Sequence, residues 1–226
     1  MKACVYEEYG EADVLQVKTD VPVTAPKATQ VVIKTFAAGI NPVAWKLRKG
    51  YIKGWPQQLP MIPGWDISGT IVAVGDEVKN GLQVGDEVFS YNRPAFDMKE
   101  SHPESAEEKM EMNGCCAEYV TAESWKVAKK PASVSLSVAG SIPLAGLTAY
   151  QGLMDHGKLT EGQTVLILNA SGGVGSYAVG IAKAHGATVI GSCSGRSAEY
   201  VKSLGADAIV DYTQGTNMCN IFFFYF

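Results

Sequence analysis

The sequence predicts an α/β protein whose first half is mostly β and whose second half is a parallel sheet with helical crossovers. An apolar run at 164–168 leads into a glycine-rich turn at 169–175 and then into a helix pattern. Two more apolar runs alternate with a second helix pattern up to residue 210. The earlier residues form short β-type runs separated by glycine and proline. A strand-helix-strand series implies parallel strands with right-handed crossovers.

The first half is expected to be a compact β domain with one helix. The N-terminal residues 1–6 are strand-like, and β-rich runs occupy 14–17, 30–37, 68–74 and 116–121. Asn41 suits a helix N-cap, Pro42 the first helical position and Gly50 the end of that helix. The polar, charge-rich stretch 93–113 is expected to be an exposed excursion between strands.

The second half supplies the strands and helices of the parallel sheet. Strands are expected at 164–168, 187–191 and 208–210, and an apolar helix at 144–150. The crossover helices are expected at 175–185, closed by a left-handed Gly186, and from Ser197 to Gly205.

The glycine turn between the first of these strands and its helix is a candidate phosphate site. The first N–H groups of a helix lack intrahelical partners, and the helix dipole adds a partial positive charge there. Glycines allow a pyrophosphate to approach those groups closely, which predicts a dinucleotide ligand. The alternative is an ordinary glycine-rich turn. The candidate ligand-binding residues are Ser171, Gly172, Gly173, Val174 and Gly175.

The tip of the second strand favours NADPH over NADH. NAD sites usually place an acidic residue about 20 residues after the glycine turn, to bind the ribose 2′-hydroxyl. Residues 191–196 contain no carboxylate that would repel a 2′-phosphate, and Arg196 could bind this group through two charge-assisted hydrogen bonds. Ser192 and Ser194 are further candidates. The alternative is that Arg196 is a solvated residue at a helix start and Ser194 a turn residue.

Composition limits the other possibilities. With 226 residues, 46% hydrophobic and 19% charged, the chain is expected to be a soluble globular protein with one large core or two modest ones. A net charge of −4 gives no reason to expect nucleic acid or an anionic membrane as the partner. The N-terminus lacks a signal-peptide pattern and no apolar run approaches the ~20 residues of a spanning helix, so a cytosolic location is expected. Five scattered cysteines and three separated histidines predict neither a disulfide framework nor a metal site.

Several motifs in order resemble the medium-chain dehydrogenase/reductase superfamily, and within it the quinone oxidoreductase (zeta-crystallin-like) branch. The resemblance implies a GroES-like β domain at 1–127 and a partial Rossmann domain, a doubly wound parallel sheet, at 128–213. It also implies that the nicotinamide lies in the cleft between them, and that NADPH reduces quinones or α,β-unsaturated carbonyls. The motifs are Gly-Ile-Asn-Pro-Val (39–43), Pro-Gly-Trp-Asp-Ile-Ser-Gly (63–69), Val-Gly-Asp-Glu-Val (84–88), Ala-Glu-Tyr-Val (117–120), Ile-Pro-Leu-Ala-Gly-Leu-Thr-Ala-Tyr (142–150) and the glycine turn.

The same resemblance implies chemistry without zinc. Zinc alcohol dehydrogenases of the superfamily have a cysteine ligand near the position of Asn41 and Gly-His-Glu where this chain has Gly-Trp-Asp at 64–66, and their structural-zinc cysteines have no counterpart here. Catalysis would then depend on positioning an enone and on hydrogen bonds to its developing enolate oxygen. Asn41 and Tyr51 are the candidate catalytic residues. The alternatives are that Asn41 is only an N-cap and Tyr51 a packed loop aromatic; Ala44 replaces an Asp common in related reductases.

Two further residues are candidates near the coenzyme. By resemblance Thr148 lies close to the coenzyme, although a helical threonine can also bond its own backbone. Tyr212 follows the third strand, where its ring could flank the phosphate-ribose end of the coenzyme or simply pack.

The resemblance stops near Thr213, and residues 214–226 are expected to be a tail foreign to the family. Related enzymes continue beyond this point, so a truncated product is expected, with an open sheet edge and an uncovered apolar face. Full-length relatives imply a homodimer. Three alternatives remain open: an active reductase, a crystallin-like protein that binds NADPH without turnover, and an inactive fragment.

Overall fold

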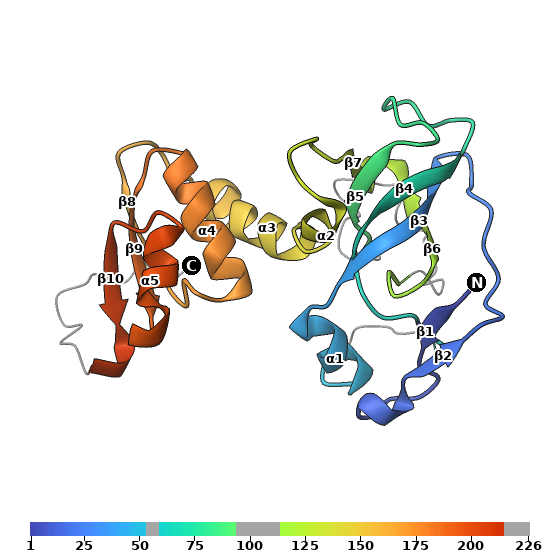
Figure 1. Ribbon diagram of the computed structural model, residues 1–226, viewed down its shortest axis with the longest axis horizontal. Helices are drawn as coiled ribbons and strands as arrows, with labels where there is room; N and C mark the ends of the chain where they lie inside the picture. Colours follow the sequence, from blue (N-terminus) through green and yellow to red (C-terminus); the bar gives the residue numbers. More distant parts are fainter. Residues whose placement is uncertain (53–58, 94–113, 215–226) are drawn as a thin grey trace. The chain divides into compact units, whose positions relative to one another are not determined.

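A computed structural model describes residues 1–52, 59–93 and 114–214 (Figure 1). The chain divides into two compact units, Met1–Leu144 and Ala145–Phe226, each with its own hydrophobic core. Most of the expected excursion at 93–113 and of the tail at 214–226 lies outside the described residues. The functional division into domains at 1–127 and 128–213 stays a prediction.

The first unit is built on a five-stranded antiparallel sheet with strand order β6-β3-β4-β5-β7. A separate two-stranded sheet of β1 and β2 is linked by a bridge between Ala3 and Ala117 to the segment just before β6. Alternate side chains of the longest strand, such as Val31 and Ile33, are completely buried in the core. The strands are β1 (Ala3–Val5), β2 (Gln16–Lys18), β3 (Gln30–Gly39), β4 (Asp66–Val74), β5 (Glu87–Tyr91), β6 (Tyr119–Glu123) and β7 (Val127–Lys129).

The β-rich first half is confirmed, with local corrections. The run at 14–17 is not one strand, because a 3-10 turn (Ala12–Val14) precedes β2. Strand β6 begins at Tyr119 rather than at residue 116. The sequence did not predict β5, whose core-facing Ser90 hides the apolar alternation. The short β7 and the four-residue helix α2 (Leu136–Ala139) were also missed.

The expected helix after β3 is present as α1 (Pro42–Arg48). Proline occupies its start, and Gly50 follows its end with a φ of +68°. Asn41 stands at the N-cap position, but its side chain makes no capping hydrogen bond. The interpretation of Asn41 as a side-chain cap is therefore wrong, because its amide donates to the carboxylate of Asp66 instead.

The second unit confirms the β-α-β-α-β series. Its three strands are parallel in the order β10-β9-β8, and the positive φ angles of Gly186 and Gly205 lie just after the two crossover helices. A π-helical segment (Gln151–His156) follows α3 directly. The strands are β8 (Thr164–Ile167), β9 (Thr188–Cys193) and β10 (Ala208–Asp211), and the helices are α3 (Pro143–Tyr150), α4 (Gly173–Ala184) and α5 (Ala198–Ser203).

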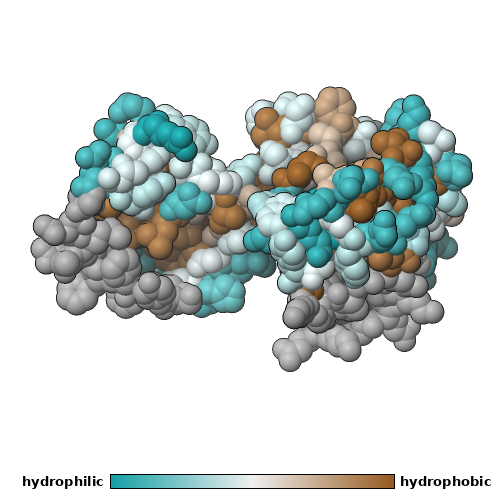
Figure 2. Space-filling model, turned by 90° about the horizontal axis from the view of Figure 1, so that it is seen from below, coloured by the Kyte–Doolittle hydropathy of each residue, from teal (hydrophilic) through white to brown (hydrophobic). Residues whose placement is uncertain are grey.

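The core of this unit lies between the sheet and its crossover helices. Val179 and Val201 from these helices pack with Val189 of the central strand. Leu166 and Ile190, which alternate with the core-facing residues, are only partly buried. Figure 2 shows apolar surface on this unit, as expected for a sheet that is incompletely covered. None of the helices in the described ranges is long and apolar enough to cross a membrane.

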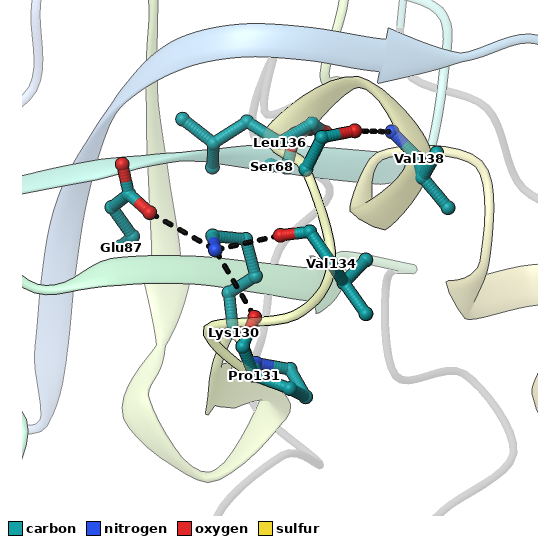
Figure 3. A network of polar contacts seen from close by, with 8 residues as sticks. Ser68, Glu87, Lys130, Pro131, Val134, Leu136 and Val138 are labelled. Carbon is teal, nitrogen blue, oxygen red and sulfur yellow. Dashed lines mark hydrogen bonds and ion pairs between the residues drawn. The ribbon is translucent and has the colours of Figure 1, made fainter.

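A network of polar contacts around Lys130 holds the segment between β7 and α2 against strands β4 and β5 of the first unit. The Lys130 ammonium lies 3.1 Å from Glu87 Oε2 and donates to the carbonyl oxygens of Pro131 at 3.1 Å and Val134 at 2.7 Å (Figure 3). The Ser68 hydroxyl donates to the Leu136 carbonyl at 2.5 Å, two residues further along this segment. The chain leading to α2 is therefore fixed to β4 and β5.

Replacing Lys130 by methionine is expected to lower the free energy of unfolding of the first unit by about 1–2 kcal/mol, because two carbonyl groups lose their charged donor. The Lys130 side chain is only 6% exposed, whereas that of Glu87 is 53% exposed. Glu87→Gln is the matched control and should change stability by less than about 0.5 kcal/mol. Urea unfolding of both variants tests this, and an equal loss would mean that the ion pair, not the carbonyl contacts, stabilises the segment.

Candidate active site and coenzyme-binding turn

The glycine turn joins β8 to the start of α4. Asn169 adopts a left-handed φ of +50°, and the N–H of Gly172 donates to its carbonyl oxygen at 2.8 Å. The helix begins at Gly173, two residues earlier than expected from the sequence, and its first repeating hydrogen bond runs from the Ser176 N–H to the Gly172 oxygen. Helix geometry therefore leaves the N–H groups of residues 173–175 for a ligand.

The three glycines of this turn have different surroundings. A Cβ on Gly175 would lie 2.2 Å from the Asn169 oxygen, and one on Gly172 would lie 2.5 Å from Asn169 Nδ2. A Cβ on Gly173 would meet nothing within 4 Å. Gly175 is thus required for close packing of the turn, because the clash is with backbone, whereas Gly172 lies against the end of the Asn169 side chain and Gly173 presents open backbone. This geometry suits an anion at the helix N-terminus.

The loop after β9 presents a cation beside this turn. Ser192 is buried near the end of β9, and its carbonyl oxygen accepts the Ala170 N–H at 2.8 Å. Ser194 precedes a 3-10 turn (Gly195–Ser197), and its carbonyl oxygen accepts the Ser197 N–H at 2.9 Å. The Arg196 side chain is exposed and forms no ion pair with the described residues. It is therefore available to an external anion.

The structure adds one carboxylate that the sequence analysis missed at this strand tip. Asp211 ends β10 and pairs in register with Cys193, the last residue of β9. Hydrogen bonds from Thr213, first from its hydroxyl, lower the pKa of Asp211. Residues 191–196 themselves contain no carboxylate, but parallel pairing brings one to the end of β9 from the next strand.

The remaining coenzyme candidates are both exposed. Thr148 lies on α3 and Tyr212 in a 3-10 turn (Tyr212–Gln214) directly after β10. The Tyr212 side chain is 59% exposed, so packing does not account for it within the described residues. Their roles at a coenzyme stay predictions.

The candidate catalytic asparagine is held by a buried carboxylate. Asn41 Nδ2 donates to Asp66 Oδ2 at 2.8 Å, and the backbone N–H of Leu144 donates to Asp66 Oδ1 at 2.9 Å. Asp66 is 1% exposed, and this burial raises the pKa of its carboxyl against the opposing effect of the two hydrogen bonds. The sequence alone indicates Asp66 only as part of a motif, because its partners are distant along the chain.

A glycine makes room for this carboxylate. Gly39 pairs with Asp66 across β3 and β4, and a Cβ on Gly39 would lie 2.8 Å from the Asp66 Cβ. The same Cβ would lie 2.6 Å from the carbonyl oxygen of Gly140. The glycine at the end of β3 is therefore needed for the close approach of three segments around Asp66.

Tyr51, the second catalytic candidate, is not brought to Asn41 by a hydrogen bond among the described residues. Its side chain is 63% exposed, and its ring meets Trp45 edge-on with centroids 5.9 Å apart. The Lys49 ammonium lies 5.6 Å from the centroid of the Tyr51 ring. The ring therefore packs at an edge against Trp45 while most of the side chain is exposed, and both the packed-aromatic alternative and the catalytic role stay predictions.

The residues at this place do not suit a catalytic zinc ion. The described part of the chain contains no group of three or more His, Cys, Asp or Glu side chains placed to hold a metal. Asn41 and Asp66 bond to each other, and an amide is a poor zinc ligand compared with a thiolate or imidazole. Zinc-independent chemistry stays a prediction.

Comparisons with known proteins place the chain in a family. Residues 27–132 match the alcohol dehydrogenase GroES-like domain, and residues 173–220 match the family described as zinc-binding dehydrogenase. The chain is 41% identical to 2-methylene-furan-3-one reductase of Solanum lycopersicum over 95% of this chain and 53% of that protein. It belongs to the quinone oxidoreductase branch of the medium-chain dehydrogenase/reductase superfamily.

Further members of this superfamily support the same placement. The chain is 39% identical to the NADPH-dependent alkenal/one oxidoreductase, chloroplastic, of Arabidopsis thaliana, over 95% of this chain and 53% of that protein. The quinone oxidoreductase structure from Coxiella burnetii superimposes with a TM-score of 0.80 at 33% identity, covering 98% of this chain and 65% of that one. The chain thus spans about half the length of these curated relatives, and the α/β fold with GroES-like and Rossmann parts is confirmed.

Proposed function

We propose that this chain contains the residues that bind coenzyme and substrate in an NADPH-dependent oxidoreductase. This enzyme would reduce quinones or α,β-unsaturated carbonyls without zinc. The open helix N-terminus at Gly173, with Arg196 exposed on the next loop, is the observation that carries the proposal. The printed functions of the relatives, an alkenal/one oxidoreductase and a quinone oxidoreductase, agree with it.

The coenzyme would be held by backbone and by a few side chains. Its pyrophosphate would accept hydrogen bonds from the N–H groups of residues 173–175 at the start of α4. Its 2′-phosphate would pair with Arg196 and the Ser194 hydroxyl. Bound NADPH supplies the hydride. Thr148 and Tyr212 would flank the coenzyme. Ser192, buried near the end of β9, would support the loop at 194–196 that follows this strand.

Asn41 would act on the substrate oxygen. One Nδ2 hydrogen is already donated to Asp66, which fixes the orientation of the amide. The second Nδ2 hydrogen would donate to the carbonyl oxygen of the substrate as negative charge develops on it. Tyr51 would add a hydroxyl donor. The gain comes from donors held in place before the reaction rather than from a metal ion.

Mixing the full chain with NADPH and a test enone, and following the nicotinamide absorbance, tests the proposal directly. Turnover with NADPH exceeding that with NADH is expected. Thermal protection by NADPH without turnover would indicate a crystallin-like binding protein. Neither protection nor turnover would indicate an inactive fragment, and both results would contradict the proposal. The expected cytosolic location stays a prediction, since the Arabidopsis relative is named chloroplastic. The expected homodimer stays a prediction as well.

Replacing Arg196 by alanine is expected to weaken NADPH binding by roughly 10- to 100-fold, the equivalent of losing charge-assisted hydrogen bonds to a phosphate. NADH affinity should hardly change, because NADH lacks the 2′-phosphate. Lys202→Ala removes the same charge from α5 and is the matched control. Fluorescence titration with both coenzymes gives the dissociation constants, and an equal loss for NADPH and NADH would rule out contact of Arg196 with the 2′-phosphate.

A further inference from the structure

A carboxylate on β10 fixes the loop that follows β9. The Thr213 N–H and hydroxyl donate to Asp211 Oδ1 at 2.9 and 2.7 Å, which orients the carboxylate. The N–H of Gly195 also donates to this carboxylate. A Cβ on Gly195 would lie 2.6 Å from Asp211 Oδ2, so the loop backbone rests directly against it. The loop is thus joined to β10 as well as to β9.

The same contacts determine what the loop presents to a ligand. Ser194 accepts the Ser197 N–H at 2.9 Å, which closes the turn on its other side. Arg196 lies between these two fixed points, with an exposed side chain that has no ion pair among the described residues. Asp211 therefore holds the backbone of the turn without occupying the arginine side chain.

We propose that Asp211 is a positioning residue for coenzyme selection, which orders the turn at 194–196 so that Ser194 and Arg196 are preset for a 2′-phosphate. The inference rests on the proposed function, because it assumes that NADPH binds at the end of β9. It assigns to an acidic residue a favourable effect on the binding of an anion.

Two opposing effects decide the sign of that contribution. A carboxylate repels a nearby phosphate, but Asp211 is partly exposed, so water and salt screen its charge. Its oxygens are moreover engaged with Thr213 and Gly195. Ordering a loop before the ligand arrives removes that cost from binding. We expect the ordering to dominate, so that loss of Asp211 weakens NADPH binding about five- to tenfold.

Asp207, the residue directly before β10, supplies a matched control at the opposite end of that strand. Its Oδ2 accepts the Val189 N–H at 2.7 Å and forms an ion pair with Lys183 at 2.9 Å. Like Asp211, it therefore accepts a hydrogen bond from a backbone N–H of a neighbouring segment, here β9 itself. Hydrogen bonds, led by that of Val189, likewise lower the pKa of its carboxyl. Because it lies at the amino end of β10, its loss should not alter the coenzyme loop.

The test is a fluorescence titration of the full chain and its variants with NADPH and with NADH. Asp211→Ala should weaken NADPH five- to tenfold and NADH less than twofold, with Asp211→Asn intermediate because one acceptor oxygen remains. Asp207→Ala should leave both affinities within twofold of the unsubstituted chain. Thermal unfolding curves establish that each variant is folded, and the asparagine variant serves if the alanine variant is not.

Combining Asp211→Ala with Arg196→Ala completes the experiment. If Asp211 acts by presenting Arg196, its removal should have little further effect on NADPH once Arg196 is absent. Tighter NADPH binding by Asp211→Ala would show that repulsion dominates, and an equal loss for both coenzymes would show a merely structural role; either result overturns the inference. Absence of NADPH binding by the unsubstituted chain would instead overturn the proposed function, and the inference with it.

Discussion

Gly175→Ala is expected to lower the free energy of unfolding of the second unit by about 3 kcal/mol and to abolish NADPH binding with it. The new Cβ would lie 2.2 Å from the Asn169 oxygen and 2.8 Å from the Ala170 Cα. Both are backbone atoms of the turn after β8, so no side-chain rotation can relieve the overlap. The helix must move away from the sheet, which opens the core around Val179. Urea unfolding measured beside coenzyme titration gives both effects.

Gly173→Ala separates packing from binding. A Cβ at this position meets nothing within 4 Å, so stability should stay within about 0.5 kcal/mol of the unsubstituted chain. The added methyl group nevertheless covers backbone that would face the pyrophosphate, and NADPH should bind about tenfold more weakly. Unchanged NADPH affinity in this stable variant would mean that the phosphates are held elsewhere.

Asp66→Ala is expected to destabilise the first unit by about 2–4 kcal/mol, because two partly buried donors lose their buried acceptor. These donors are the Asn41 amide and the Leu144 N–H. Reductase turnover should fall roughly 10- to 100-fold, while NADPH affinity changes little, since the freed Asn41 amide no longer has a fixed orientation. Unchanged turnover in folded protein would remove Asn41 and Asp66 from the proposed mechanism.

Asn41→Asp provides a pH-dependent companion variant. It places a second carboxyl group against Asp66, and two adjacent carboxylates cannot both ionise cheaply, so one folded-state pKa rises further. The folded state then binds more protons than the unfolded state does. The stability of this variant should be greatest below about pH 4, the unfolded aspartate pKa, and should fall as pH rises through the raised pKa of the folded protein. Stability measured by urea unfolding at pH 4 and pH 8 tests the sign, and a rise with pH would contradict it.

Local features of the fold could be predicted from the sequence, because their determinants are adjacent in the chain. The glycine turn between strand and helix is one example, and Gly186 at the end of α4 is another. Strand β5 was not predicted, because its buried Ser90 interrupts the apolar alternation. The motif order also indicated the family, which the comparisons then confirmed.

The side-chain contacts of the candidate sites could not be predicted in the same way. Asn41 has the ideal sequence context of a helix cap, yet its amide turns to a carboxylate on β4. Asp211 comes beside Gly195 only through the parallel pairing of β9 and β10. Both contacts join residues that are remote in the chain, and single-sequence patterns describe neighbours only.

The two aspartates at the ends of β10, Asp207 just before it and Asp211 as its last residue, have a practical consequence for protein engineering. Asp207 secures the strand at one end, so a mutational library confined to Asp211 and residues 194–196 would leave that anchor intact. Variants with altered coenzyme preference could then be screened without a general loss of foldability.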